Sequence, residues 1–80
     1  MSDSQKLTSL HSTVAETSAR LIDAFAEEQR TNLLCANNPA DPASLELWRA
    51  ARREVERIAE HYAIALEHYR EAVLRALPRR

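Results

Sequence analysis

Two histidines are the first candidates for metal chemistry in this 80-residue chain. The tripeptide Glu60-His61-Tyr62 recurs seven residues later as Glu67-His68-Tyr69, which places His61 and His68 two turns apart on one side of a helix. Metal sites in helical bundles use Glu-x-x-His or His pairs at i, i+4, because these spacings let the ligands converge. The residues three before each histidine are apolar here. We therefore expect two half-exposed histidines without a metal, and a site shared between two copies stays an alternative.

A second candidate is a row of arginines. Arg49, Arg53 and Arg57 follow one another at i, i+4 and i+8, with Arg52 alongside, a spacing that suits contacts to successive phosphates. Glutamates interleave with them, and the net charge of −1 gives no general attraction to nucleic acid. We expect a solvated, salt-bridged face. A small nucleic-acid-binding or regulatory bundle that uses the Arg49–Arg57 edge remains an alternative function.

Catalytic and membrane functions have little basis in this sequence. The chain has no glycine, which excludes the glycine-rich loops that hold phosphates and dinucleotides. Its one cysteine, Cys35, has no histidine or basic cluster nearby in sequence that would lower its pKa. No apolar run approaches the roughly 18 residues of a membrane span, and the first residues lack the pattern of a secretory signal. We predict a non-enzyme without a cofactor, located in the cytoplasm and away from membranes.

The helix-breaking residues define the elements that position these side chains. Pro39 and Pro42 cluster near the middle, and Pro78 lies near the end. Between them the chain is rich in Ala, Leu, Arg and Glu, without strand-like alternation. We predict a single all-α domain over residues 1–80, made of two helices at about 4–36 and 42–77. Asp41 before Pro42 is a strong helix start, and Ser2 with Gln5 fits a capping box.

The apolar spacing predicts that the two helices pair as an antiparallel hairpin. In the second helix Trp48, Val55, Tyr62, Tyr69 and Ala76 recur every seven residues, as in a helix with one broad apolar face. A turn near Pro39 makes the numbers of facing residues sum to about 79. This register places apolar residues opposite each other. The expected pairs are Phe25 with Val55, Leu21 with Ile58, Val14 with Ala65 and Leu66, and Leu10 with Tyr69.

The charges favour the same register. It brings Glu27 and Glu28 near Arg52 and Arg53, Asp23 near Arg57, and Arg20 near Glu60. Eight of the first 20 residues are Ser or Thr, and these compete with the helix for backbone hydrogen bonds. The N-terminal third is thus either a solvated helix face or a segment that becomes ordered on binding.

Two helices alone bury little apolar surface, so we expect the fold to be completed by association. Dimerisation or a partner helix would give a four-helix bundle. The predicted function is that of a protein-interaction or adaptor protein acting through the apolar and aromatic face from Trp48 to Val73, as a co-chaperone or regulatory subunit. The predicted interface residues are Leu10, Val14, Leu21, Phe25, Trp48, Val55, Ile58, Tyr62, Leu66, Tyr69 and Val73.

Two resemblances accompany this prediction. The stretch from Ala65 to Ala72 resembles the second helix of a tetratricopeptide repeat, although Arg53 and Glu56 stand where that repeat has glycine and tyrosine. The size and hairpin plan are similar to those of the small helical co-chaperones of bacterial type III secretion. That second resemblance implies a partner that is a helical secreted subunit, kept soluble by the hairpin.

Overall fold

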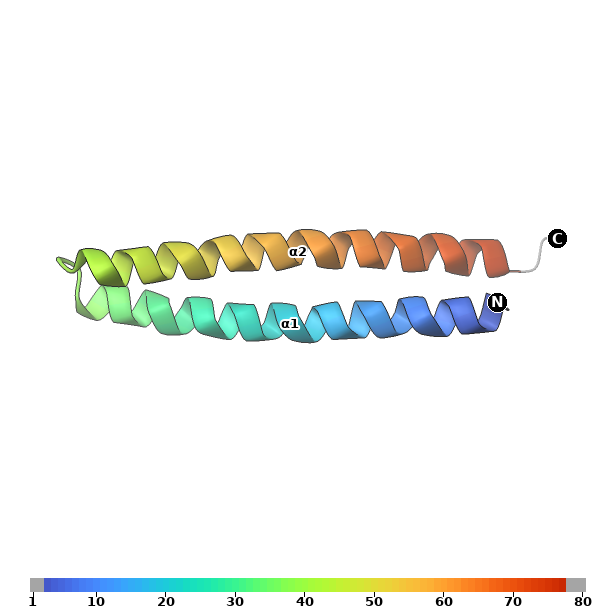
Figure 1. Ribbon diagram of the computed structural model, residues 1–80, viewed down its shortest axis with the longest axis horizontal. Coiled ribbons are helices and arrows are strands. Elements are labelled where there is room, and N and C mark those ends of the chain that lie inside the picture. Colours follow the sequence, from blue (N-terminus) through green and yellow to red (C-terminus); the bar gives the residue numbers. More distant parts are fainter. Residues whose placement is uncertain (1–2, 78–80) are drawn as a thin grey trace.

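The computed structural model describes residues 3–77 and shows two helices lying side by side (Figure 1). Helix α1 spans Asp3–Asn37 and helix α2 spans Pro42–Ala76, 35 residues each. They run antiparallel along a rod of 62 × 18 × 15 Å, with the start of α1 and the end of α2 at the same end of the rod. This confirms the predicted all-α hairpin, and both helices lie within one residue of their expected bounds.

The connection between the helices is short and uses side chains to close both helix ends. Asn38 donates its backbone N–H and its side-chain amide to the carbonyl oxygen of Leu34, at 3.1 and 3.0 Å. Asp41 caps α2 by accepting from the Ala43 N–H at 3.1 Å and from the Ser44 hydroxyl at 2.8 Å. Pro42 occupies the first turn, where no N–H is needed. The predicted start at Asp41 is confirmed, whereas Ser2 and Pro78 lie outside the described residues.

The serines and threonines of α1 do not interrupt the helix. The hydroxyls of Thr8 and Thr13 donate to the carbonyl oxygens four residues earlier, at 2.9 and 3.1 Å, and Thr17 does the same to Thr13. A hydroxyl that bonds back to its own helix competes less with the backbone ladder. Helix α1 is therefore continuous from Asp3, and its threonine donors have partners without a second chain.

The two helices meet along one seam with a strict seven-residue repeat. Written as heptads, the a and d positions alternate at spacings of three and four residues in both helices, and every facing pair of numbers sums to 79. The seam positions of α1 are Leu7, Leu10, Val14, Thr17, Leu21, Ala24, Glu28, Thr31 and Cys35. Those of α2 are Ser44, Trp48, Ala51, Val55, Ile58, Tyr62, Ala65, Tyr69 and Ala72. The predicted register is the one observed.

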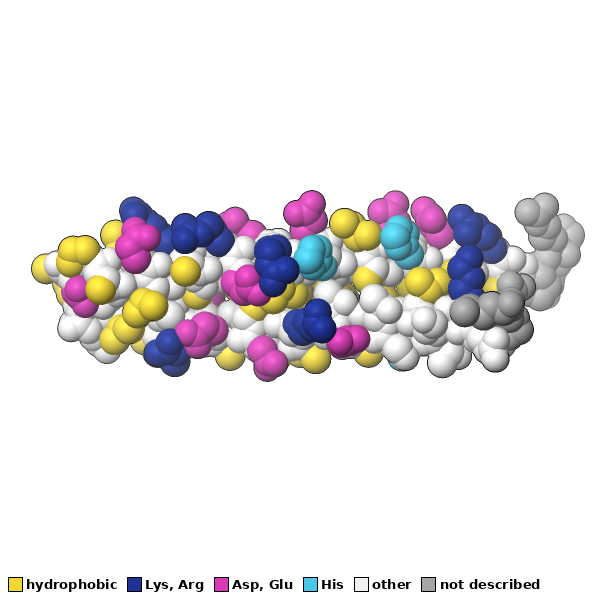
Figure 2. Space-filling model, in the orientation of Figure 1, with side chains coloured by type: hydrophobic (Ala, Val, Ile, Leu, Met, Phe, Trp, Pro, Cys, Tyr) yellow, Lys and Arg dark blue, Asp and Glu magenta, His cyan; other side chains and the backbone are white. Residues whose placement is uncertain are grey.

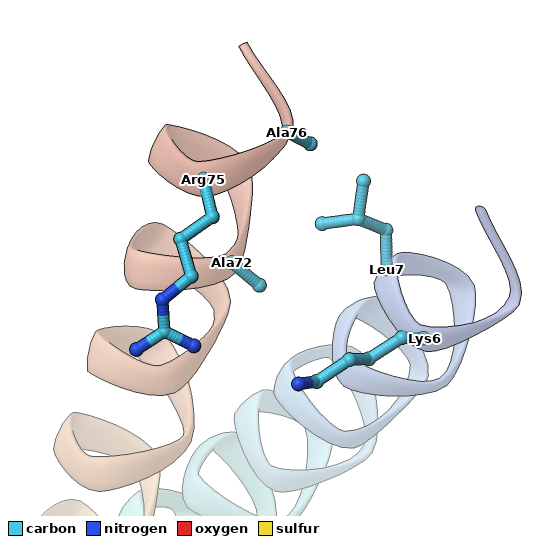
Figure 3. Close-up of a pocket in the computed structure, with 5 residues that line it drawn as sticks. All are labelled: Lys6, Leu7, Ala72, Arg75 and Ala76. Atoms are coloured by element: carbon cyan, nitrogen blue, oxygen red, sulfur yellow. The ribbon is translucent and has the colours of Figure 1, made fainter. Parts of the chain in front are cut away.

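The contacts at three places along the rod support this register. Ala24, Val55 and Ile58 form the buried cluster, with Leu21 packed against it. The ring of His11 lies edge-on to that of Tyr69, with centroids 5.6 Å apart. At the open end, the side chain of Leu7 points toward α2 (Figure 3).

Two details of the predicted packing are wrong. Ala24, not Phe25, fills the seam opposite Val55, and Phe25 is 48% exposed beside it. A strict heptad count from Leu7 gives this phase, because Phe25 then falls one position after the seam residue.

The predicted cross-helix charge pairs are confirmed only for Glu28, which pairs with Arg52 at 3.5 Å. Three of the other charges named in that prediction pair within their own helices: Arg20 with Glu16, Glu27 with Arg30, and Arg57 with Glu54. Residues three or four apart on one helix are closer neighbours than charges on the outer faces of two helices.

The Asp41 cap gives the first testable expectation. Asp41→Ala removes the acceptor for the Ala43 N–H and the Ser44 hydroxyl, so the free energy of unfolding should fall by about 1 kcal/mol. Urea denaturation followed by circular dichroism measures this. Asp41→Asn keeps an acceptor and should lose less. Equal losses in the two variants would show that capping is not the function of this side chain.

Candidate interaction surfaces

The side chains that suggested metal chemistry do not come together. His61 and His68 are exposed on α2, at heptad position g, seven residues apart. Over residues 3–77 there is no group of three or more His, Cys, Asp or Glu placed to hold a metal ion. Cys35 is half-buried near the turn.

Three of the four arginines in the row pair with glutamates. Arg49 pairs with Glu46 at 2.9 Å, Arg57 pairs with Glu54, and Arg52 lies 3.3 Å from Glu56 as well as near Glu28. Hydrogen bonds from Arg57 lower the pKa of the Glu54 carboxyl, and those from Arg30 lower the pKa of Glu27. The three paired arginines must give up a carboxylate before they contact phosphate.

The hollows on the described surface are small or open. The one at the open end of the rod has a volume of about 50 Å³ and lies between Lys6 and Leu7 of α1 and three residues of α2 (Figure 3). Lys6 and Arg75 line the same hollow with positive charge. A hairpin of two helices is two helices wide and one helix thick. Such a rod cannot enclose a substrate away from water. The surfaces rather than the hollows are the candidates for function.

The two long flanks of the hairpin differ in chemistry. One flank is formed by heptad positions c and g of both helices. Its groove is lined by Thr13, Thr17, Arg20, His61, Ile64, Ala65 and His68, and farther along by Asp23, Glu54 and Arg57. This charged flank is the face drawn in Figure 2, where basic and acidic side chains follow both helices and histidine side chains lie over α2.

The other flank is formed by position e of both helices, and its apolar residues belong mostly to α2. Helix α2 contributes a strip in which four of five e positions are apolar and half-buried: Leu45, Ala59, Leu66 and Val73. Tyr62 and Tyr69 border it from the seam, and Tyr69 and Val73 line a hollow with Arg70 and Leu74. We call this row the α2 strip. It is the part of the helix-2 face that the seam leaves exposed to a partner.

The predicted interface residues divide between seam and surface. Val55 and Ile58 are buried between the two helices, where they hold the hairpin together. Phe25 is exposed and the rest are half-buried: Leu10, Val14, Leu21, Trp48, Tyr62, Leu66, Tyr69 and Val73. Sequence reasoning missed Ala24, Thr31 and Ser44, which are among the most buried residues. Their burial can be predicted from the strict alternation of three- and four-residue spacings between seam positions. Their side chains alone do not suggest it.

One charged residue lies in the seam. Glu28 is 13% exposed at a seam position, and Arg52 covers it from position e of α2. Its Oε2 atom is buried without a hydrogen-bond partner among the described residues. A carboxylate in this setting loses hydration that a single ion pair only partly replaces. Glu28 therefore lowers the stability of the hairpin relative to an apolar residue.

Comparison of the chain with protein-family models, curated proteins and solved structures finds no match. Neither helix, within the described residues, combines the length and apolarity needed to cross a membrane. The function must therefore be argued from the surfaces themselves.

The buried carboxylate gives a second expectation. Glu28→Leu should raise the free energy of unfolding by about 1–3 kcal/mol, because an apolar seam residue replaces an incompletely bonded carboxylate. Thermal and urea denaturation at one fixed protein concentration measure the change. Glu56→Gln removes the other carboxylate near Arg52 at an exposed position and should change stability little. A Glu28→Leu protein less stable than the parent would contradict this account of the seam.

Proposed function

We propose that this protein is a non-enzymatic interaction module whose α2 strip receives a helix of a partner chain. The observation that supports this is an excess of surface. The chain exposes 6259 Å², whereas a compact monomer of its 9.1 kDa would expose about 4,900 Å². A hairpin this elongated leaves apolar side chains in water that a further helix would cover.

The chemistry of the α2 strip suits a helical partner. Leu66, Tyr69 and Val73 follow one another at spacings of three and four on one side of α2, which is the spacing that a second helix contacts. The aromatic rings combine a large apolar area with a polar edge, a combination common at the centre of protein interfaces. The groove beside the strip is bordered by α1, so an incoming helix would touch both helices of the hairpin.

A co-chaperone for a helical subunit is the most concrete form of this function. A chaperone of this kind shields an apolar helix of its client until the client assembles, and a hairpin with one apolar flank can supply such cover. Salt bridges within each helix keep the other flank hydrated, which favours a complex that remains in solution.

Site-specific photo-crosslinking in the native cells tests this function. A crosslinker at Leu66 or Val73 should give one discrete adduct, because the partner helix lies on the strip, and the attached chain should contain an amphipathic helix. The matched control is Ile64, which is 46% exposed on the charged flank of the same helix and should give no such adduct. Adducts that are equal at Leu66 and Ile64, or absent at both strip positions, would refute the proposal.

A further inference from the structure

The outer face of α1 carries no charge over its whole length. Between Ser4 and Asn37 every Lys, Arg, Asp and Glu of α1 occupies heptad position c, g or a. Positions e, b and f, which cover about half of the helix surface, are filled by the following residues: Ser4, Gln5, Thr8, His11, Ser12, Ala15, Ser18, Ala19, Ile22, Phe25, Ala26, Gln29, Asn32, Leu33 and Ala36. We call this the neutral face of α1.

Helix α2 provides an internal comparison, since it has the same length and the same seam. Four of its five outermost f positions are charged, and they are Glu46, Arg53, Glu60 and Glu67. Every f position of α1 is uncharged. A helix whose outer side faces water normally carries charges there. The outer side of α2 fits that description and the outer side of α1 does not.

The neutral face also exposes large apolar side chains. Ile22 and Leu33 are 65% and 63% exposed, and Phe25 is nearly half exposed. Ala26 lies between them, and Ala15 and Ala19 lie before Ile22; all three are exposed and let a second helix backbone approach closely. The face therefore combines apolar area with small residues, as helix–helix contacts do.

We propose that a second copy of this chain packs on the neutral face, α1 against α1, antiparallel about a two-fold axis at Ile22. The proposal concerns a surface other than the α2 strip and does not depend on a partner chain binding there. Its first support is the distribution of side-chain sizes along the face. Phe25 and Leu33 lie in the C-terminal half of the face, and Ala15, Ser18 and Ala19 lie in its N-terminal half.

An antiparallel copy brings these halves together. With the axis at Ile22, Phe25 of one copy lies opposite Ala19 of the other, and Gln29 lies opposite Ala15. A parallel copy would place Phe25 against Phe25 and Ala19 against Ala19, with overpacking at one level and a void at the other. Self-complementarity of this kind is what a two-fold interface requires. The axis lies near the middle of α1, so the two helices overlap over most of their length.

The molecule has more surface than a compact chain of its mass. The chain exposes 6259 Å², which exceeds the expected surface of a compact monomer by roughly 1,400 Å², and a stable interface takes about 800 Å² from each partner. The neutral face carries no charge that an identical face would repel.

Sedimentation equilibrium over a concentration series tests the dimer. The parent chain should dimerise, and Ile22→Glu should raise the Kd about tenfold or more, because a charge then faces its own copy at the axis. Ile64→Glu, on the charged flank, is the matched control and should leave the Kd unchanged. Circular dichroism should show the same helix content in all three proteins, which excludes a folding defect.

Disulfide trapping tests the orientation. In a Cys35→Ser background, Ile22→Cys should form a linked dimer on mild oxidation. The two copies of residue 22 meet at the axis, where their Cα atoms would lie within the 4.4–6.8 Å separation that a disulfide requires. Leu33→Cys should not, because an antiparallel pair separates the two copies of residue 33 by roughly 33 Å along the axis. Efficient linkage at both positions would indicate a parallel pair and overturn the proposal.

The outcomes separate this inference from the proposed function. A parent chain that stays monomeric at all concentrations overturns the dimer and leaves binding at the α2 strip to the crosslinking test. A dimer that Ile22→Glu does not weaken also overturns it, because the copies must then meet elsewhere. The proposal is supported if dimerisation is lost only in Ile22→Glu and a disulfide-linked dimer forms only in Ile22→Cys. This holds whatever binds to α2.

Discussion

Two helices can share only one contact, and this limit governs the whole molecule. Of the seven heptad positions, a and d alone face the other helix, so most of each helix surface stays outside the contact however well the seam packs. The seam itself is narrow, because most of its buried apolar residues are alanines. Val55 and Ile58 are the large side chains buried in it. Each facing pair of seam residues buries little apolar area. The contact area of the hairpin therefore comes from the length of the seam rather than from its width.

The polar residues of the seam set register rather than strength. Glu28 is the one charged residue at a described seam position, and Arg52 is the one charged residue at position e of α2. They meet only when the facing numbers sum to 79. A shift by one heptad in either direction brings Glu28 beside Ala59 or Leu45, where no cation covers the carboxylate. Burial of Glu28 therefore destabilises hairpins shifted by one heptad more than it destabilises the native register. Near the turn, Ser44 and Asn38 add directional bonds that a shifted chain would lose.

The sequence was sufficient for the fold because the signals were local or strictly periodic. Pro39, Asp41 and Pro42 act within one turn of chain, and seven-residue spacing in α2 fixes which side faces α1. The Phe25 prediction failed because it weighed the size and apolarity of Phe25 above its spacing. The alternating spacing of three and four residues between seam positions places Ala24 in the seam. The charge pairs failed for a different reason. An arginine reaches a glutamate one turn away at little entropic cost, so Arg20 and Arg57 pair within their own helices rather than across the hairpin.

The candidate surfaces needed both the sequence and the register. The pattern of e, b and f positions is present in the sequence, but it has meaning only after the seam has fixed which columns face outward. Once it is fixed, the charges of α1 gather on one flank, while those of α2 also cover its back.

The two surfaces on the hairpin also have a joint consequence. With a two-fold axis through α1, each α2 would lie on the outside of the pair. The two α2 strips would then run in opposite directions along the rod. The dimer would then present two equivalent partner sites with fixed spacing, which raises binding to a repeated or polymeric partner far more than to a single helix.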